Sequence, residues 1–262
     1  AQESRGLGDV YKRQHHDLFV PPRVLFGARA PGGLGNPHPA AQGAAMIEAL
    51  PAFLPRFFTG LVVNIEIAVL SLLIGTAVAA PLVAMLVSGR LLAVPASILV
   101  AVLRAAPTFV VMFFLLNALP RDFAPFGLQI ADWGLAAVIL SQAVYVAAYV
   151  SDNGLVALRA LRVRDYANAV LFLPNLARAF CVVLMSSGVA AAVGTPEAIF
   201  ITIREAERMP ELGDRAALFL MVMVFFAIVL HSAFALINML RFRLVRWLKQ
   251  FVDEGQPEAL LN

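Results

Sequence analysis

The chain has 262 residues, of which 61% are hydrophobic and only 14% are charged, and its mean hydropathy is +0.82. Soluble domains are about half apolar and a quarter charged. The composition therefore excludes an ordinary soluble globular domain and predicts an all-α polytopic membrane protein. Because of this apolar composition, we expect the lipid bilayer to be a partner. The net charge is only +3, and we expect no nucleic acid among the partners.

Several kinds of chemistry are missing from the sequence. The single cysteine, Cys181, excludes an intramolecular disulfide and a site made of paired cysteines. Neither Lys12 nor Lys249 lies in a G-x-x-x-x-G-K-[ST] phosphate loop. The sequence also contains no H-E-x-x-H and no G-x-S-x-G. We therefore expect a chain that is not an enzyme, with no catalytic residue, bound cofactor or metal.

Residues 1–45 differ from the rest of the chain. They contain seven glycines and five prolines and show no hydrophobic periodicity, which is typical of a linker or a disordered segment. The first methionine is Met46, where the membrane-like sequence begins. We expect Met46 to be the biological start and residues 1–45 to be upstream sequence that packs on nothing; the alternative is a genuine flexible tail.

Gaps between charged residues predict the membrane spans, because a helix needs about 20 apolar residues to cross the bilayer. The second region contains Arg104, so it is either one helix whose arginine snorkels to the headgroups or an interfacial piece followed by a short span. We expect a transmembrane domain at 46–247 and a cytoplasmic tail at 248–262. The five expected spans cover roughly 58–87, 92–119, 133–151, 166–196 and 216–240.

The basic residues of the loops predict the orientation, because cytoplasmic loops are rich in lysine and arginine. With five spans, the loop at Arg90, the loop at 159–164 and the segment from Arg241 onward share one side, which holds eight basic residues against five on the other. We therefore expect the N-terminus outside and the C-terminus in the cytoplasm.

Three stretches in chain order resemble the membrane subunit of ATP-binding-cassette importers, in particular the polar amino-acid uptake group. They are Gly60–Ser71, which is similar to G-L-x-x-T-L-E-L-x-x-L-S; Arg104–Leu116, similar to R-G-T-P-L-L-V-Q-x-F-F-L; and Val193–Glu197, similar to I-G-x-P-E-L. The resemblance covers about residues 50–247. It implies a permease of the bacterial inner membrane that pairs with a second permease copy or paralogue, with cytoplasmic ATP-binding subunits and with an extracytoplasmic solute-binding protein.

The family's coupling loop, E-A-A-x-x-x-G-x9-I-x-L-P, is shortened in this sequence. Compared with the family, about twelve residues are missing between Ala169 and Pro174, which is ~18 Å of helix, and alanine replaces the glutamate at Ala167. The resemblance implies that what remains contacts the ATPase. This coupling remnant comprises Asp165, Tyr166, Ala167, Asn168, Ala169, Leu173 and Pro174.

Four polar residues within the spans are candidates for a substrate path: Glu66, Ser186, Ser187 and His231. An ionisable residue in a span is costly and indicates function by default. Each also has a structural alternative. Glu66 would be hydrated at the outer interface, and His231 would form a hydrogen bond to a neighbouring helix. The two serines would allow close helix packing.

The segment 197–210 has apolar residues at helical spacing with charges between them, the pattern of an amphipathic interfacial helix. It is either a docking surface for a binding protein or a helix lying on the membrane. Two other functions stay open for the whole chain: a remnant permease that only scaffolds, and a membrane enzyme.

Overall fold

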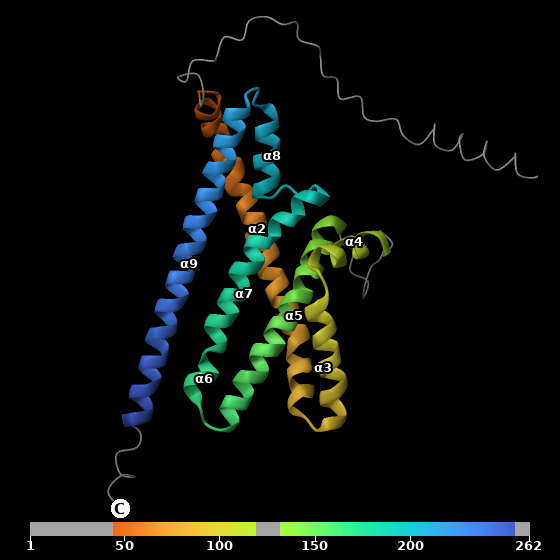
Figure 1. Cartoon of the computed structure of the whole chain (residues 1–262), viewed down its shortest axis with the longest axis vertical. Coiled ribbons are helices and arrows are strands. Elements are labelled where there is room, and N and C mark those ends of the chain that lie inside the picture. The colour runs from red at the N-terminus through yellow and green to blue at the C-terminus, as the bar shows by residue number, and fades with distance from the viewer. Residues whose placement is uncertain (1–43, 119–131, 255–262) are drawn as a thin grey trace, which may run out of the picture. The chain divides into compact units, whose positions relative to one another are not determined.

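The computed structural model describes residues 44–118 and 132–254, with side chains from 46 to 247 within these ranges. All of the described helices belong to one compact unit, Pro39–Asn262. The described residues form helices and turns without a strand (Figure 1). The elements are α2 (Ala44–Val87), α3 (Arg90–Ala105), α4 (Thr108–Ala118), α5 (Trp133–Arg162), α6 (Tyr166–Val170), α7 (Phe172–Ser186), the 3₁₀ helix η3 (Ser187–Val193), α8 (Ala198–Arg208) and α9 (Leu212–Glu254).

The predicted all-α membrane fold is confirmed. Four helical stretches are long and apolar enough to cross a bilayer, and the bent pair α3–α4 raises the number to five. The first helix, α2, is 44 residues long, or about 66 Å, so it extends well beyond a hydrocarbon core of about 30 Å. The predicted tail 1–45 lies outside the described residues except for 44 and 45, which begin α2.

The second region is two helices, so the single continuous helix over 92–119 is wrong. Helices α3 and α4 are bent by 95° relative to each other. Ala106, between them, has extended backbone angles, as expected for the residue before a proline, here Pro107. Helix α3 has 16 residues and follows α2 after the turn at Ser88 and Gly89.

The fourth span is also built of several pieces. Helix α6 has five residues, α7 fifteen, and η3 seven. The tighter 3₁₀ turns of η3 end at Gly194, whose φ of 82° lies in the left-handed region that favours glycine. Together these pieces make one candidate span, Tyr166–Val193.

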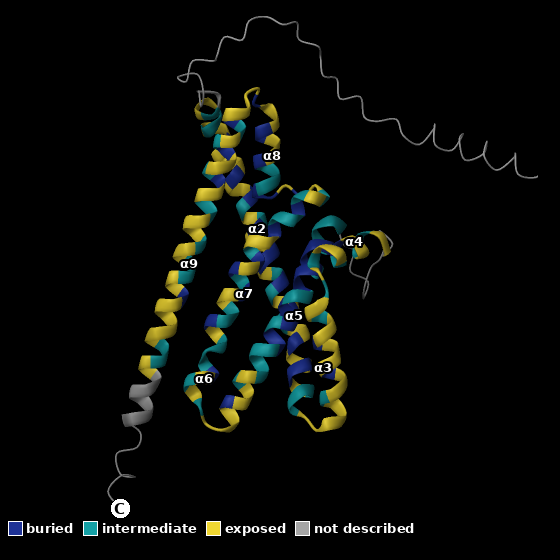
Figure 2. Cartoon of the chain, in the orientation of Figure 1, coloured by how far each residue is buried: buried dark blue, intermediate teal, exposed yellow. Residues whose placement is uncertain are grey.

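Two helices complete the unit. The amphipathic helix predicted for 197–210 is confirmed as α8, which faces α2 and α9. Helix α9 extends past the predicted span on both sides and past the start of the predicted tail at 248. Only 11% of its most apolar window is buried, against 61% for α5, and Figure 2 shows the contrast.

The core of the unit is the contact between α2 and α5, where the backbones approach closely. A Cβ built on Gly75 would lie 2.5 Å from Val146 Cβ and 2.8 Å from the carbonyl oxygen of Ala143. A side chain at this position would therefore push α2 away from α5. Apolar residues of α2, α5 and α7 surround this contact, including Ala68, Ala79, Val150 and Val183.

Candidate functional site

A buried polar cluster joins α2, η3 and α8. Asn64 Nδ2 donates to Ser187 Oγ at 2.7 Å and to Glu197 Oε2 at 2.9 Å, while Asn64 Oδ1 accepts from the amide of Ala198 at 3.1 Å. Asn64, Ser187 and Glu197 are at most 1% exposed. We call these three residues the polar junction. Because buried polar groups are stable only when hydrogen-bonded, the junction fixes the angle between the three elements.

Glu197 also caps α8. Its carboxylate accepts from the amides of Ile199 at 2.8 Å and Phe200 at 2.6 Å, two of the donors that a helix leaves unsatisfied at its N-terminus. Burial raises the pKa of the Glu197 carboxyl, and the hydrogen bonds from Ile199, Asn64 and Phe200 lower it, but burial has the larger effect. Of the junction residues, only Ser187 was among the predicted site residues; Glu197 ends the Val193–Glu197 motif, and Asn64 was not predicted.

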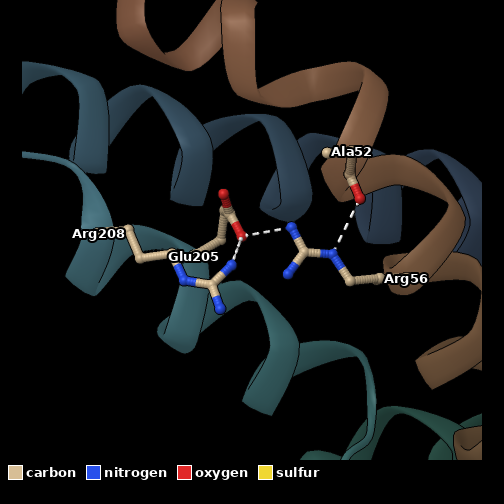
Figure 3. A network of polar contacts seen from close by, with 4 residues as sticks. All are labelled: Ala52, Arg56, Glu205 and Arg208. Carbon is tan, nitrogen blue, oxygen red and sulfur yellow. Dashed lines mark hydrogen bonds and ion pairs between the residues drawn. The ribbon is translucent and has the colours of Figure 1, made fainter.

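A second network ties the same end of α2 to α8. Arg56 Nη2 lies 2.8 Å and Arg208 Nη1 3.0 Å from Glu205 Oε2, and Arg56 Nε donates to the carbonyl of Ala52 (Figure 3). The Glu205 side chain is 8% exposed, whereas both arginine side chains are more than 40% exposed. Solvent screening keeps the contribution of such pairs near ~0–1 kcal/mol each, so the network orients α8 more than it stabilises it.

The four predicted path residues do not form one site. Ser187 is buried in the polar junction. Ser186 donates to Gln142 Oε1 at 3.1 Å and so connects α7 to α5. Glu66 and His231 are exposed on α2 and α9. Near the junction is a cavity of about 510 Å³ between α2, α7, α8 and α9, whose lining is apolar except for Asn64 and includes none of the four.

An ion pair that the sequence analysis missed joins α3 to α5. Arg104 Nη2 lies 2.6 Å from Asp152 Oδ1, with side chains 60% and 45% exposed. Arg104 is fourteen residues after the start of α3 and Asp152 ten residues before the end of α5, and these two helix ends lie at the same end of the unit (Figure 1). At 1.5 Å per residue the pair lies roughly 15–21 Å from that end.

The expected second span, 92–119, contains Arg104, and the expected third span, 133–151, ends just before Asp152, so the pair lies at the edge of the expected hydrocarbon core. The snorkelling of Arg104 to the headgroups stays a prediction; in the structure its guanidinium contacts the carboxylate of Asp152. Charged side chains are costly in lipid and normally face a bundle interior or a water-filled path. A guanidinium and a carboxylate that stay partly open can also accept the two charged groups of a zwitterion.

The coupling remnant forms the turn between α5 and α7. Asp165 caps α6 by accepting from the amide and the side-chain amide of Asn168. Ala169 and Pro174 are buried, Ala167 is half-buried, and Tyr166 and Leu173 are 45% and 58% exposed. The residue before Asp165 is Arg164, whose φ of 60° is unusual for a residue other than glycine. The turn is thus short, and its exposed apolar side chains are Val163, Tyr166 and Leu173.

Charge is distributed unequally between the two ends of the unit. The end with α6 holds Arg159, Arg162 and Arg164 from the turn after α5, together with the arginines of the last part of α9. The end with α8 holds arginines and carboxylates together. Its described acidic residues are Glu48, Asp132, Glu197, Glu205, Glu207, Glu211 and Asp214.

No group of three or more histidine, cysteine or acidic side chains in the described part of the chain could hold a metal ion. Neither a protein-family model nor a curated protein matches the sequence. Among solved structures, a chain from the "Crystal structure of an amino acid ABC transporter with histidines" is similar, with a TM-score of 0.59 and 17% sequence identity over 75% of this chain and 97% of that chain. At this identity the likeness concerns the fold, and the chain therefore shares the fold of that chain of an ABC transporter.

Proposed function

We propose that the chain is the membrane-spanning permease subunit of an ATP-driven importer for amino acids or similar small polar solutes. The fold similarity extends over nearly the whole of the matched transporter chain. Three stretches of sequence, at Gly60–Ser71, Arg104–Leu116 and Val193–Glu197, resemble the same class of protein. Catalysis of ATP hydrolysis would belong to separate cytoplasmic subunits, which use this chain as their membrane partner.

The single observation that carries the proposal is the Arg104–Asp152 ion pair. The pair lies at the edge of the predicted hydrocarbon zone and remains partly open, which is unfavourable unless water or another polar surface reaches it. A free amino acid has one carboxylate and one ammonium group, so it is complementary to this pair. The pair would line the path that this chain forms with a second permease copy or paralogue.

The charge asymmetry supports the orientation that accompanies this function. Cytoplasmic ends of membrane proteins are enriched in arginine, and the α6 end is the arginine-rich one. We place this end and the C-terminus in the cytoplasm of a bacterium, with the inner membrane between them and α8. ATP-binding subunits would approach α6, and an extracytoplasmic solute-binding protein would approach α8.

Purification of the full chain from its native membrane tests the proposal. We expect an ATP-binding subunit to co-purify in mild detergent. The reconstituted complex should accumulate labelled amino acids when ATP is enclosed and the binding protein is outside, whereas a non-hydrolysable ATP analogue should abolish accumulation. Uptake that does not depend on ATP, or the absence of any co-purifying ATPase, would contradict the proposal.

The short α6 favours one alternative, a non-transporting scaffold. A permease must press a rigid element into the ATPase, and five helical residues offer little rigid surface. We expect the chain as it stands to bind its ATPase weakly, and insertion of a twelve-residue E-A-A segment after Ala169 to strengthen binding. A pull-down with and without the insertion measures this. Tight binding together with substrate-stimulated ATP hydrolysis by the uninserted chain would show that the short turn suffices.

A further inference from the structure

A groove between α7 and α9 lies at the arginine-rich end of the unit, away from the polar junction and from the Arg104–Asp152 pair. It has a volume of about 510 Å³, within the range of about 300–1,000 Å³ that is typical of small-molecule sites. The residues lining it are Leu173, Pro174, Ala177, Ile237, Leu240, Arg243, Leu244 and Trp247. All of them are apolar except Arg243 and the indole nitrogen of Trp247.

The groove is lined by large apolar side chains that remain accessible. Leu173 is 58% exposed, Leu240 52% and Trp247 54%, whereas Ile237 at its floor is 8% exposed. The apolar lining residues of α9 are spaced three or four apart, so they form one stripe that faces α7. They are Ile237, Leu240, Leu244 and Trp247. A stripe of this kind requires an apolar occupant if it is to be shielded from water.

The position of the groove along α9 indicates what kind of apolar molecule fits. The uncharged stretch 216–240 ends at Arg241, so the membrane boundary falls within the groove. Ile237 lies on the hydrocarbon side of Arg241, and Trp247 lies six residues beyond Arg241, about 9 Å, on the headgroup side. Tryptophan is enriched at this interface. The occupant must therefore be apolar at one end and polar at the other.

The charge around the groove indicates the polar end. Arg243 lines it, and the neighbouring described side chains at this end of the unit are strongly basic, with a single carboxylate, Asp165, that is already used to cap α6. The basic residues are Arg159, Arg162, Arg164, Arg178, Arg241 and Arg246. Arginine binds phosphate oxygens through its planar pair of donors, and basic residues beside a membrane attract anionic lipids.

We propose that this groove binds one anionic phospholipid, with an acyl chain along Ala177 and Ile237 and the phosphate against Arg243. The lipid would fill the space that separates the end of α9 from α7 and would hold the least buried helix of the bundle in place. The site is independent of transport, because it depends only on the groove, its arginine and the membrane boundary.

Trp247 provides a local probe, since the chain contains only two tryptophans, Trp133 and Trp247. In a Trp133→Phe background, the full chain is placed at one molecule per nanodisc in phosphatidylcholine. Brominated phosphatidylglycerol or brominated phosphatidylcholine is then titrated in, because bromine quenches only a tryptophan that it touches. We expect phosphatidylglycerol to quench at a mole fraction about fivefold lower than phosphatidylcholine, the preference that one basic contact supplies.

Three variants locate the effect. Arg243→Gln should remove most of the preference, and Ala177→Phe should reduce quenching by both lipids because it fills the groove. Arg241→Gln removes the same charge two residues away, from a side chain that does not line the groove, and should retain the preference. A melting measurement checks that each variant folds.

Three results would overturn the proposal. Equal quenching by both lipids would mean that the groove does not select an anionic headgroup. A preference that survives both Arg243→Gln and Ala177→Phe would place the anionic lipid elsewhere. If neither lipid quenches Trp247, the groove is covered by protein, either another segment of this chain or a second copy.

Discussion

The polar junction and the Arg104–Asp152 pair both link helices that are far apart in sequence, but they differ in how their polar groups are satisfied. The junction residues are at most 1% exposed and are satisfied by one another and by the N-terminus of α8. The ion pair keeps about half of each side chain accessible and lies at the edge of the expected hydrocarbon core. A closed, satisfied network holds helices together, whereas an open pair of charges in the same environment remains available to a ligand.

Substitution of the central junction residue should have the largest effect on stability. Asn64→Leu leaves Glu197 and Ser187 without their shared donor and the amide of Ala198 without its acceptor. Unsatisfied buried groups cost ~1–3 kcal/mol each, so we expect a loss of about 3 kcal/mol or more. Thermal unfolding in detergent measures it. Asn117→Leu is the matched control, because Asn117 is exposed and, among the described residues, its side chain bonds within its own helix, to the carbonyl of Phe113.

A smaller loss is expected where α2 touches the backbone of the junction. A Cβ on Gly60 would lie 2.7 Å from the amide nitrogen of Ala198 and 2.8 Å from the carbonyl carbon of Glu197. Gly60→Ala must therefore move α8, at a cost of about 1–3 kcal/mol. Gly213→Ala, where a Cβ meets nothing within 4 Å, should leave the melting midpoint unchanged or raise it. Equal effects of the two substitutions would mean that α8 is not held tightly at this point.

The junction should also respond to pH through Glu197, whose pKa is raised by burial from the ordinary value of 4.5. The pKa of Glu197 is higher in the folded state than in the unfolded state. At pH values between these two pKa values, the folded state therefore binds more protons than the unfolded state. The contribution of Glu197 to the free energy of unfolding is therefore greatest below about pH 4.5, and it falls as the pH rises through the raised pKa. Melting midpoints from pH 4 to 8 should decline more steeply for the wild type than for Glu197→Gln. Glu207→Gln, at an exposed position, should follow the wild type.

The smallest effect on stability is expected at the ion pair. Both of its side chains are exposed, so Arg104→Gln should cost only ~0–1 kcal/mol after solvent screening. Differential melting of the single variants and of the double variant Arg104→Gln/Asp152→Asn measures the coupling between the two charges. A loss as large as that of Asn64→Leu would mean that the pair belongs to the structural framework, and the contrast with the junction would disappear.

The sequence predicted the helices better than it predicted their contacts. Long gaps between charges indicated the spans, because the bilayer admits few charged residues, and α8 was recognisable from its amphipathic spacing. The break after α3 was foreseeable from Pro107. The extension of α2 and α9 was not, because hydropathy reports where lipid begins and a helix can continue beyond it.

The two polar clusters show why the site was harder to predict. Asn64 and Glu66 are two positions apart in the sequence, and the charge of Glu66 made it the more conspicuous candidate for a site residue. Residues two apart in a helix point about 200° away from each other, so Asn64 is buried while Glu66 is exposed. The Arg104–Asp152 pair joins residues 48 positions apart, and no local pattern relates them. An amide within an apolar stretch is the signal that could have identified Asn64.

The central claim is that the exposed ion pair serves solute passage while the closed junction maintains the fold. The most direct test measures ATP-driven uptake by the reconstituted complex for Asp152→Asn, normalised to folded protein, alongside its melting midpoint. The account predicts a loss of at least about tenfold in uptake, as expected when one partner of a charged contact is removed, with an unchanged midpoint. Uptake equal to that of the wild type at an unchanged midpoint would contradict it.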